Sequence, residues 1–270
     1  MVDLKHNLRK KLESSKKVFG PIIGPGNKPA KTVKMLADAG FDFVLLDLEH
    51  NLVNKETIFD YIRACTEMEM PIIVRPEENM AFFRSFLDSG ANGMMLSHVD
   101  TVEQAVFAVN QSYYPPLGNR GCGMGPYLID PQSRSGQPFL TLTEHVNANT
   151  LIFPQTESLK SINNLGNILK LDGITGTIVG SFDLAIDIGD IDPGATLQEI
   201  IETAVVEENL GKVSKICREA GKVAGIGGLT PKGCAKWARE GYQLFLIGQV
   251  INGNLNSAKQ LIENAKSLVD

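Results

Sequence analysis

The stretch FDFVLLDLEHN, residues 41–51, indicates how this chain folds and where its polar chemistry lies. Its apolar part, residues 43–46, is typical of a strand that is buried on both faces of a parallel sheet. The run then gives way to polar residues, among them Asp47, Glu49 and His50. A buried strand that ends in two carboxylates and an imidazole predicts a site at the carboxyl end of that strand.

Further apolar runs of this kind are spaced along the chain, and amphipathic helical patterns separate most of them. Several helical patterns end at a glycine, as helices often do. Eight strand-then-helix units in 270 residues predict an α/β fold, a single-domain (β/α)₈ TIM barrel over residues 1–270. An open, doubly wound sheet is the structural alternative. The predicted strands are residues 18–24, 43–47, 71–75, 93–97, 150–155, 176–180, 223–227 and 244–248.

Two segments interrupt the alternation of strands and helices. Residues 113–149, rich in Gly, Pro and Tyr at their start, are predicted to form a long excursion between two strands. Residues 181–196, rich in Asp and Gly, are predicted to form a second loop. A last helix is predicted from about Asn254 to Leu268.

The composition argues against several classes of protein. A net charge of −5 argues against a nucleic-acid partner, since phosphates demand a basic surface. No apolar run approaches the roughly 20 residues of a membrane span, and the charged N-terminal segment lacks the apolar core of a signal peptide. The four cysteines show no C-x-x-C spacing, so we expect free thiols and a cytoplasmic location.

The strand ends carry the candidate site, because active sites of such barrels lie at the carboxyl ends of the strands, the barrel mouth. Glu157 and Asp183 each follow an apolar run, on neighbouring strands. Two carboxylates so placed suit a hard divalent cation, which prefers oxygen ligands. Arg75 ends another strand and would offer a forked donor to a carboxylate or an enolate oxygen.

His50 could move protons near neutral pH, and Asp47, which lies three residues earlier, could orient it. Simpler roles stay open for all of these residues. Strand-end carboxylates often cap the following helix, and His50 could be a hydrogen-bonded structural residue. Arg75 could also form a plain ion pair with Asp47 or Glu49 inside the mouth.

Three other features are interpreted as structural. His98 and His145 are two of them. The third is the glycine-rich RGCGMG, residues 120–125, which does not follow a strand and lacks the lysine of a phosphate-binding loop. It is interpreted as a tight loop that lets the backbone approach the pocket.

Several segments, taken in order, are similar to those of a known family. They are AGFDFVLLDLEHN, PIIVRP, LDSGANGMML, SYYPPLGNRGCG, PQTES and VGSFDLA. Any one of these matches would be weak, whereas their order and spacing together are specific. On these segments the chain resembles the HpcH/HpaI family of metal-dependent class II hydroxy-oxo-acid (pyruvate) aldolases.

The resemblance implies a TIM barrel and a homo-oligomer, a hexamer built as a trimer of dimers, in which the C-terminal helix packs across a subunit interface. It implies a divalent metal, Mg²⁺, Mn²⁺ or a similar ion, held by Glu157 and Asp183. Arg75 matches the arginine beside the substrate oxygen. His50 matches the histidine that acts in proton transfer, with Asp47 as its partner.

The resemblance also implies the substrates and further binding residues. Asp88 matches an acid that reaches a neighbouring subunit's site, and Gln155 matches a polar residue of the pocket. Backbone N–H groups at Gly180, Ser181 and Phe182 would hold the substrate carboxylate. The implied reaction cleaves or forms a 4-hydroxy-2-oxo acid, with pyruvate or another 2-oxo acid and an aldehyde as partners, through a metal-stabilised enolate.

The chain departs from the family pattern at the pocket wall. Leu48 stands where a small residue is common, Ser97 and Ser181 stand where proline is common, and residues 122–127 are bulkier than expected. These departures leave two alternatives open. One is a condensing or decarboxylating enzyme that acts on oxaloacetate, citrate-synthase-like, on the same barrel. The other is a non-catalytic barrel that serves as a binding protein.

Overall fold

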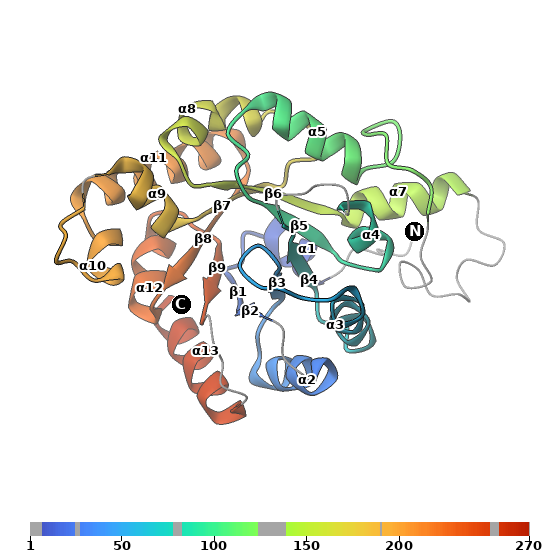
Figure 1. Cartoon of the computed structure of the whole chain (residues 1–270), viewed down its shortest axis with the longest axis horizontal. Coiled ribbons are helices and arrows are strands. Elements are labelled where there is room, and N and C mark those ends of the chain that lie inside the picture. The colour runs from blue at the N-terminus through green and yellow to red at the C-terminus, as the bar shows by residue number, and fades with distance from the viewer. Residues whose placement is uncertain are drawn as a thin grey trace.

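Parallel strands at the centre, with helices around them, make up the computed structural model of this chain (Figure 1). Its described residues contain nine strands, paired in the order β1-β9-β8-β7-β6-β5-β4-β3-β2. From β2 to β9, neighbours in the sheet are neighbours along the chain, without the reversal that marks a doubly wound sheet. The predicted α/β barrel is confirmed as a nearly closed parallel barrel. The structure describes residues 7–24, 28–77, 83–123, 139–189, 191–248 and 254–269.

The first predicted strand is divided at Pro21, and this division closes the barrel. β1 (Val18–Gly20) pairs with β9 (Leu244–Ile247), whereas β2 (Ile22–Ile23) pairs with β3 (Val44–Asp47). Proline has no backbone N–H to donate to a ladder, so the strand breaks there. Residues 18–23 therefore link β9, with which β1 pairs, to β3, with which β2 pairs.

The other predicted strands are confirmed, with small differences at their ends. Their residues are almost all buried, as strands that are covered on both faces require. They are β4 (Ile72–Arg75), β5 (Gly93–Leu96), β6 (Leu151–Thr156), β7 (Gly176–Val179) and β8 (Val223–Leu229).

Alternate side chains along each strand belong to two hydrophobic clusters. In β3, Val44 and Leu46 face the surrounding helices, whereas Leu45 belongs to the cluster inside the barrel. Leu8 and Leu12 of α1 (Asn7–Glu13) join the inner cluster, so this helix closes one end of the barrel. Each such side chain contributes roughly 1.5–3 kcal/mol by its burial.

The remaining helices form the outer layer in Figure 1. Their apolar faces pack on the strands, and glycines in the left-handed conformation end several of them, as at Gly40 (φ 93°). They are α2 (Pro29–Ala39), α3 (Lys55–Glu67), α4 (Phe83–Asp88), α5 (Val102–Ser112), α7 (Phe139–Asn149), α8 (Leu159–Ile168), α9 (Ser181–Ile188), α10 (Leu197–Ile201), α11 (Ala204–Ala220), α12 (Pro231–Arg239) and α13 (Leu255–Val269).

The prediction of a loop over residues 181–196 is wrong in its first half. α9 occupies that half, buries Leu184 and Ala185, and ends at Gly189 (φ 77°). The excursion over residues 113–149 likewise contains a helix, α7. The bulky segment noted in the sequence, residues 122–127, lies outside the described residues from position 124 onward.

The predicted last helix is α13, which packs against α12 and α2 of the same chain. Ala258, Ile262 and Ala265 form its buried face. Packing of this helix against another subunit stays a prediction. Within the described ranges, no helix combines the length and the apolar character needed to cross a membrane.

Candidate active site

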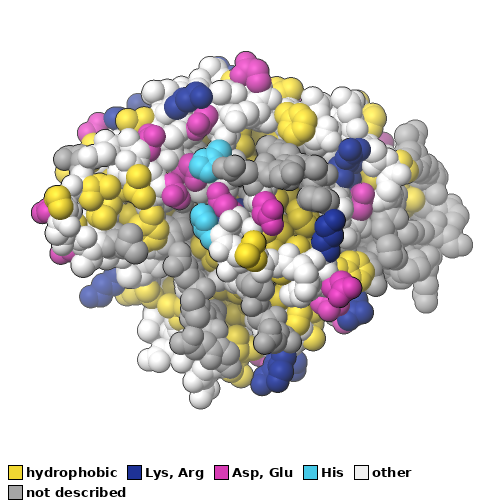
Figure 2. Space-filling model, in the orientation of Figure 1, with side chains coloured by type: hydrophobic (Ala, Val, Ile, Leu, Met, Phe, Trp, Pro, Cys, Tyr) yellow, Lys and Arg dark blue, Asp and Glu magenta, His cyan; other side chains and the backbone are white. Residues whose placement is uncertain are grey.

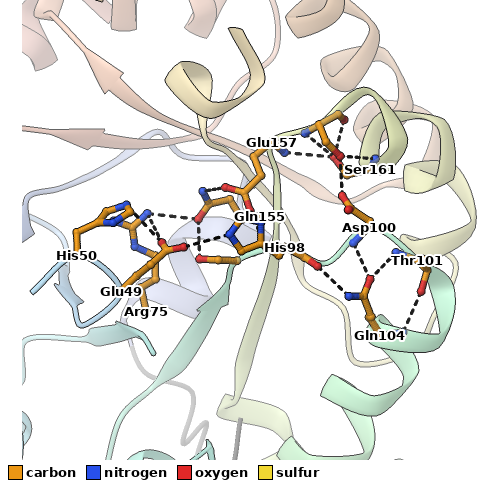
Figure 3. Close-up of polar contacts among 12 residues, drawn as sticks. Glu49, His50, Arg75, His98, Asp100, Thr101, Gln104, Gln155, Glu157 and Ser161 are labelled. Carbon is orange, nitrogen blue, oxygen red and sulfur yellow. Dashed lines mark hydrogen bonds and ion pairs between the residues drawn. The ribbon is translucent and has the colours of Figure 1, made fainter. Parts of the chain in front are cut away.

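Polar side chains from the carboxyl ends of four neighbouring strands, β3 to β6, meet at the mouth of the barrel (Figure 3). Figure 2, in the orientation of Figure 1, shows histidine and acidic side chains close together near the middle of this face. The sheet register explains part of this meeting. Asp47 pairs with Arg75 across β3 and β4, so the two side chains start from adjacent positions.

Arg75 is the cation at the centre of the mouth. Its side chain is 8% exposed, and its Nε donates to Oδ1 of Asp47 at 2.8 Å. Nη1 lies 3.0 Å from Oε2 of Glu49 and 3.4 Å from Oε1 of Gln155. Both ion pairs that the sequence left open are therefore present. A guanidinium bound on several sides is fixed in orientation before any substrate binds.

Asp47 has different partners from those expected. Besides Arg75, it accepts hydrogen bonds from the backbone N–H of Glu49 and from Nδ2 of Asn51, both at 3.1 Å. His50 instead places Nε2 3.6 Å from Oε2 of Glu49, and its side chain is 61% exposed. The expected Asp47–His50 pair is wrong in this structure, because the register sets Asp47 directly beside the arginine.

Glu157 is buried at the end of β6 and is bound on two sides. Nε2 of Gln155 donates to Oε2, and the backbone N–H of His98 donates to Oε1 at 2.5 Å. Ser97 Oγ lies 3.4 Å from Oε1 of Gln155 and extends the network. The buried amide and carboxylate are thus paired rather than left unsatisfied.

His98 belongs to the mouth, although the sequence analysis interprets it as structural. Its Nδ1 lies 3.3 Å from Oε1 of Glu157, and its Nε2 lies 3.7 Å from Oε1 of Glu49. A positive φ of 55° turns the chain here, directly after β5. The signal that could have identified it was its position directly after an apolar strand.

The electrostatics of the mouth centre on Glu157. The pKa of this carboxyl group is raised to about 7, mainly by burial and also by the negative charges of Glu49 and Asp183. The hydrogen bond and the charge of His98 oppose that rise. Several carboxylates in a partly dry site would be stabilised by a bound cation.

Gly180 lies between the two predicted metal ligands. A Cβ atom at this position would be 3.2 Å from Oδ2 of Asp183, 3.3 Å from Cβ of Glu157 and 2.6 Å from Nε2 of Gln155. The structure therefore brings Asp183, from the first turn of α9, and Glu157 to the same place. The absence of a side chain at Gly180 keeps that place open.

The donor set fits magnesium in one respect. In the part of the chain that the structure describes, no group of three or more His, Cys, Asp or Glu side chains is placed to hold a metal. Glu157 and Asp183 stay the predicted protein ligands. Mg²⁺ typically takes one or two carboxylates and keeps several waters, so a two-carboxylate site with room for substrate suits it.

The predicted carboxylate site lies at the start of α9. Ser181 is buried, and its Oγ donates to the backbone carbonyl of Gly227 at 2.9 Å. The first N–H groups of a helix, here at Ser181 and Phe182, have no partner within the helix and favour anions. Ser181 thus positions this turn through its side chain and offers its backbone.

Asp88 is held away from this network. Its Oδ1 accepts from Nη2 of Arg120 at 2.6 Å, and the Arg120 side chain is fully buried. Among the described residues, none of the mouth side chains forms a hydrogen bond or an ion pair with Asp88. Its expected role in a neighbouring subunit's site stays a prediction.

Comparison with known proteins places this geometry in a family. Residues 24–243 match the model of the HpcH/HpaI aldolase/citrate lyase family. The hydroxypyruvate/pyruvate aldolase of Agrobacterium fabrum is 32% identical over 201 residues, which cover 73% of this chain and 70% of that protein. The 2-keto-3-deoxy-L-rhamnonate aldolase of Klebsiella pneumoniae is 29% identical over 218 residues, which cover 80% and 77%.

Solved structures agree with this assignment. An HpcH/HpaI aldolase from Desulfitobacterium hafniense superposes with a TM-score of 0.81 at 26% identity, over 96% of each chain. The citrate lyase beta subunit of Mycobacterium tuberculosis, solved with oxaloacetate and magnesium, superposes with a TM-score of 0.56 at 14% identity. At that identity the second likeness shows the fold alone. The chain belongs to the HpcH/HpaI aldolase/citrate lyase family, and it is a carbon–carbon lyase of the aldolase type.

Proposed function

We propose that this chain is a metal-dependent aldolase that cleaves or forms 4-hydroxy-2-oxo acids, with pyruvate or a related 2-oxo acid and an aldehyde as partners. The observation that carries the proposal is Arg75, buried at the mouth between Asp47 and Glu49 and next to Gln155. The curated relatives, named as aldolases of pyruvate-type acids, support it.

Arg75 would stabilise the oxygen of the 2-oxo group as it gains negative charge. Because its ion pairs with Asp47 and Glu49 fix the guanidinium in advance, the charge develops against a donor that need not reorganise. A divalent cation held by Glu157 and Asp183 would supply further positive charge to the oxygens of the oxo acid. The N–H groups at residues 181 and 182 would bind the substrate carboxylate.

His50 would carry the proton of the aldol hydroxyl. In the direction of cleavage, its imidazole takes the proton from the 4-hydroxyl group while the C3–C4 bond breaks. The electron pair of that bond moves to C3 and the 2-oxo group, which gives an aldehyde and the enolate of the oxo acid. A proton added at C3 then completes pyruvate. Asp47 acts indirectly, because it positions Arg75 and the turn that carries His50.

The proposal includes a hexamer in which Asp88 serves a neighbouring subunit. Its partner Arg120 is buried and fixes the Asp88 carboxylate, which stays 26% exposed. Light scattering on the purified chain, compared with the Asp88→Asn variant, tests this part. A monomer with full activity would contradict it.

Proton exchange at C3 of pyruvate tests the chemistry directly. We expect NMR in D₂O to show loss of the methyl protons with Mg²⁺ or Mn²⁺, no loss after chelation, and recovery when metal is restored. Glu157→Gln and Asp183→Asn should abolish this exchange and weaken metal binding. The matched control is Glu219→Gln, which removes a carboxylate that is 64% exposed on the outer helix α11.

The possible outcomes separate the proposal from its alternatives. Exchange that persists in either variant, or that ignores the metal, would overturn the proposed ligands. No exchange with pyruvate, together with metal-dependent consumption of oxaloacetate, would replace the proposal by the condensing or decarboxylating enzyme. No reaction with either acid, in protein that still binds metal, would favour a binding protein.

A further inference from the structure

A cavity of about 570 Å³ lies at the end of the barrel opposite the mouth. We call it the amino-end cavity, because Leu151 and Val223, the first residues of β6 and β8, contribute to its lining. Thr175 and Gln243, which directly precede two other strands, also line it, and α1 covers it on one side. Its volume is in the range of sites that hold small molecules.

The charges in the amino-end cavity are mainly positive. Four cationic side chains line it, two from residues 9–17 and two from residues 218–222, whereas Glu13 is the acid among its described lining residues. This concentration is opposite in sign to the chain as a whole, which carries −5 at pH 7. The four cations are Arg9, Lys17, Arg218 and Lys222.

Two of these cations are fixed by backbone carbonyl groups. Nη2 of Arg9 donates to the carbonyl of Thr150 at 2.5 Å, and Nζ of Lys222 donates to the carbonyl of Ile174 at 2.6 Å. Burial lowers the pKa of Lys222, the charge of Asp172 partly opposes this, and the nearby charge of Arg9 lowers it further. Two like charges held close in a partly desolvated site would be stabilised by an anion.

The other two cations are available at the edge of the cavity. Among the described residues, neither Lys17 nor Arg218 forms a hydrogen bond through its side chain or an ion pair. Arg218 lies in the last turn of α11, with Nη1 3.9 Å from the position of a Cβ on Gly241. An arginine fork next to ammonium groups is the usual arrangement for binding phosphate oxygens.

We propose that the amino-end cavity is a binding site for a small phosphorylated metabolite, held by Arg9, Lys17, Arg218 and Lys222. The ligand is a small molecule, because the four cations line one cavity of about 570 Å³ and not an extended basic face. The site is separate from the mouth, since the filled interior of the barrel lies between the two ends. Binding at this site does not depend on the aldolase proposal.

Calorimetric titration of the full-length chain with inorganic pyrophosphate tests the site, at constant ionic strength and with EDTA present. We expect saturable binding that Arg218→Ala and Lys17→Ala each weaken about tenfold, as loss of one charged hydrogen-bond donor predicts. Because neither side chain bonds to a described residue, both variants should keep the wild-type melting temperature. The matched control is Lys215→Ala, on the same helix with a 69% exposed side chain, which should change affinity less than about twofold.

Each outcome decides the proposal. Saturable binding that falls in both cavity variants and stays in the control supports it. No saturable binding overturns it. Equal affinity in all variants also overturns it, because pyrophosphate would then bind elsewhere, as at Arg75. A response to sodium sulfate of the same size as that to pyrophosphate would show a general effect of anions and would likewise overturn it.

Discussion

The two ends of the barrel are built from the same strands but carry opposite charge. At the mouth, Glu49 and Glu157 outnumber the buried Arg75, and the side chains bond mainly to one another. At the amino end, Arg9 and Lys222 donate to backbone carbonyls, and α1 closes the interior. Side chains that bond to one another can bind and transform a substrate, whereas hydrogen bonds from side chains to backbone carbonyls stabilise the fold. We therefore expect variants at the mouth to change turnover, and loss of a structural tie at the amino end to change stability and leave turnover unchanged.

The largest effect should come from Arg75→Met, which tests the mouth most severely. The change leaves Asp47 and Glu49 buried without their cation, so we expect a loss of roughly 3–5 kcal/mol in the free energy of unfolding. Turnover should fall by about 10²–10³-fold, because a fixed donor to the developing charge is gone. Urea unfolding and kcat/KM measure the two effects.

Arg75→Lys is the control for charge in that experiment. It keeps the positive charge without the fork, so it should recover stability more fully than turnover. Equal recovery of both would mean that Arg75 acts only as a structural ion pair.

Gly180→Ala should reduce turnover by about tenfold or more, because its Cβ would displace the Gln155 amide, 2.6 Å away, from Glu157. The matched control is Gly227→Ala, where the nearest atom would be 3.5 Å away, an ordinary contact. Steady-state kinetics and the Kd for Mn²⁺ measure the effect. Equal losses in both variants would show a general sensitivity of the strand ends.

Asp42→Ala tests the amino end. Asp42 is bound to Lys11 at 2.5 Å and to the backbone N–H of Phe19 at 2.9 Å, so we expect unfolding to become easier by roughly 1–3 kcal/mol. Asp38→Ala, which removes an exposed partner of Lys34, should cost less than about 0.5 kcal/mol. Urea denaturation measures both changes. Turnover should stay within about twofold of wild type in both variants, and a tenfold fall in the Asp42 variant would contradict the division between the ends.

The smallest effect concerns the pH dependence of stability in chelated protein. Folding raises the pKa of Glu157 from an ordinary 4.5 to about 7, so its contribution to stability is fully present below 4.5 and is lost as pH rises through 7. Glu157→Gln does not titrate. Its melting temperature relative to wild type should therefore rise by a few degrees between about pH 5 and about pH 8. A difference that is constant over this range would contradict the raised pKa.

The sequence predicts the barrel well because most of its strands are predominantly apolar runs. The division of the first strand at Pro21 could not be predicted, because the sequence shows only a proline inside an apolar run. The strands that pair on either side of this proline depend on the arrangement of the whole sheet. The sequence does not predict the helix α9, because it is short and lies in a segment rich in Asp and Gly, which is typical of a loop. Its burial of Leu184 against the barrel, a tertiary contact, stabilises it.

The candidate site could be predicted as a set of residues but not as a set of contacts. Arg75, Glu157 and Asp183 converge because parallel strands end on one face. The partner of Asp47 depends on register, which places Arg75 beside it and leaves His50 with Glu49. A positive φ at His98 directs this residue into the mouth, and that backbone conformation could not be predicted from the neighbouring sequence.

The divided first strand has a consequence for synthesis of the chain. Val18 pairs with Leu244, so the first strand of the barrel to be synthesised must wait for the last strand before its ladder can form. Contacts between such distant residues form slowly, because a long loop must close first. We therefore expect nascent chains truncated before β9 to keep an open sheet with two exposed edges, and the barrel to form only after β9 has been synthesised.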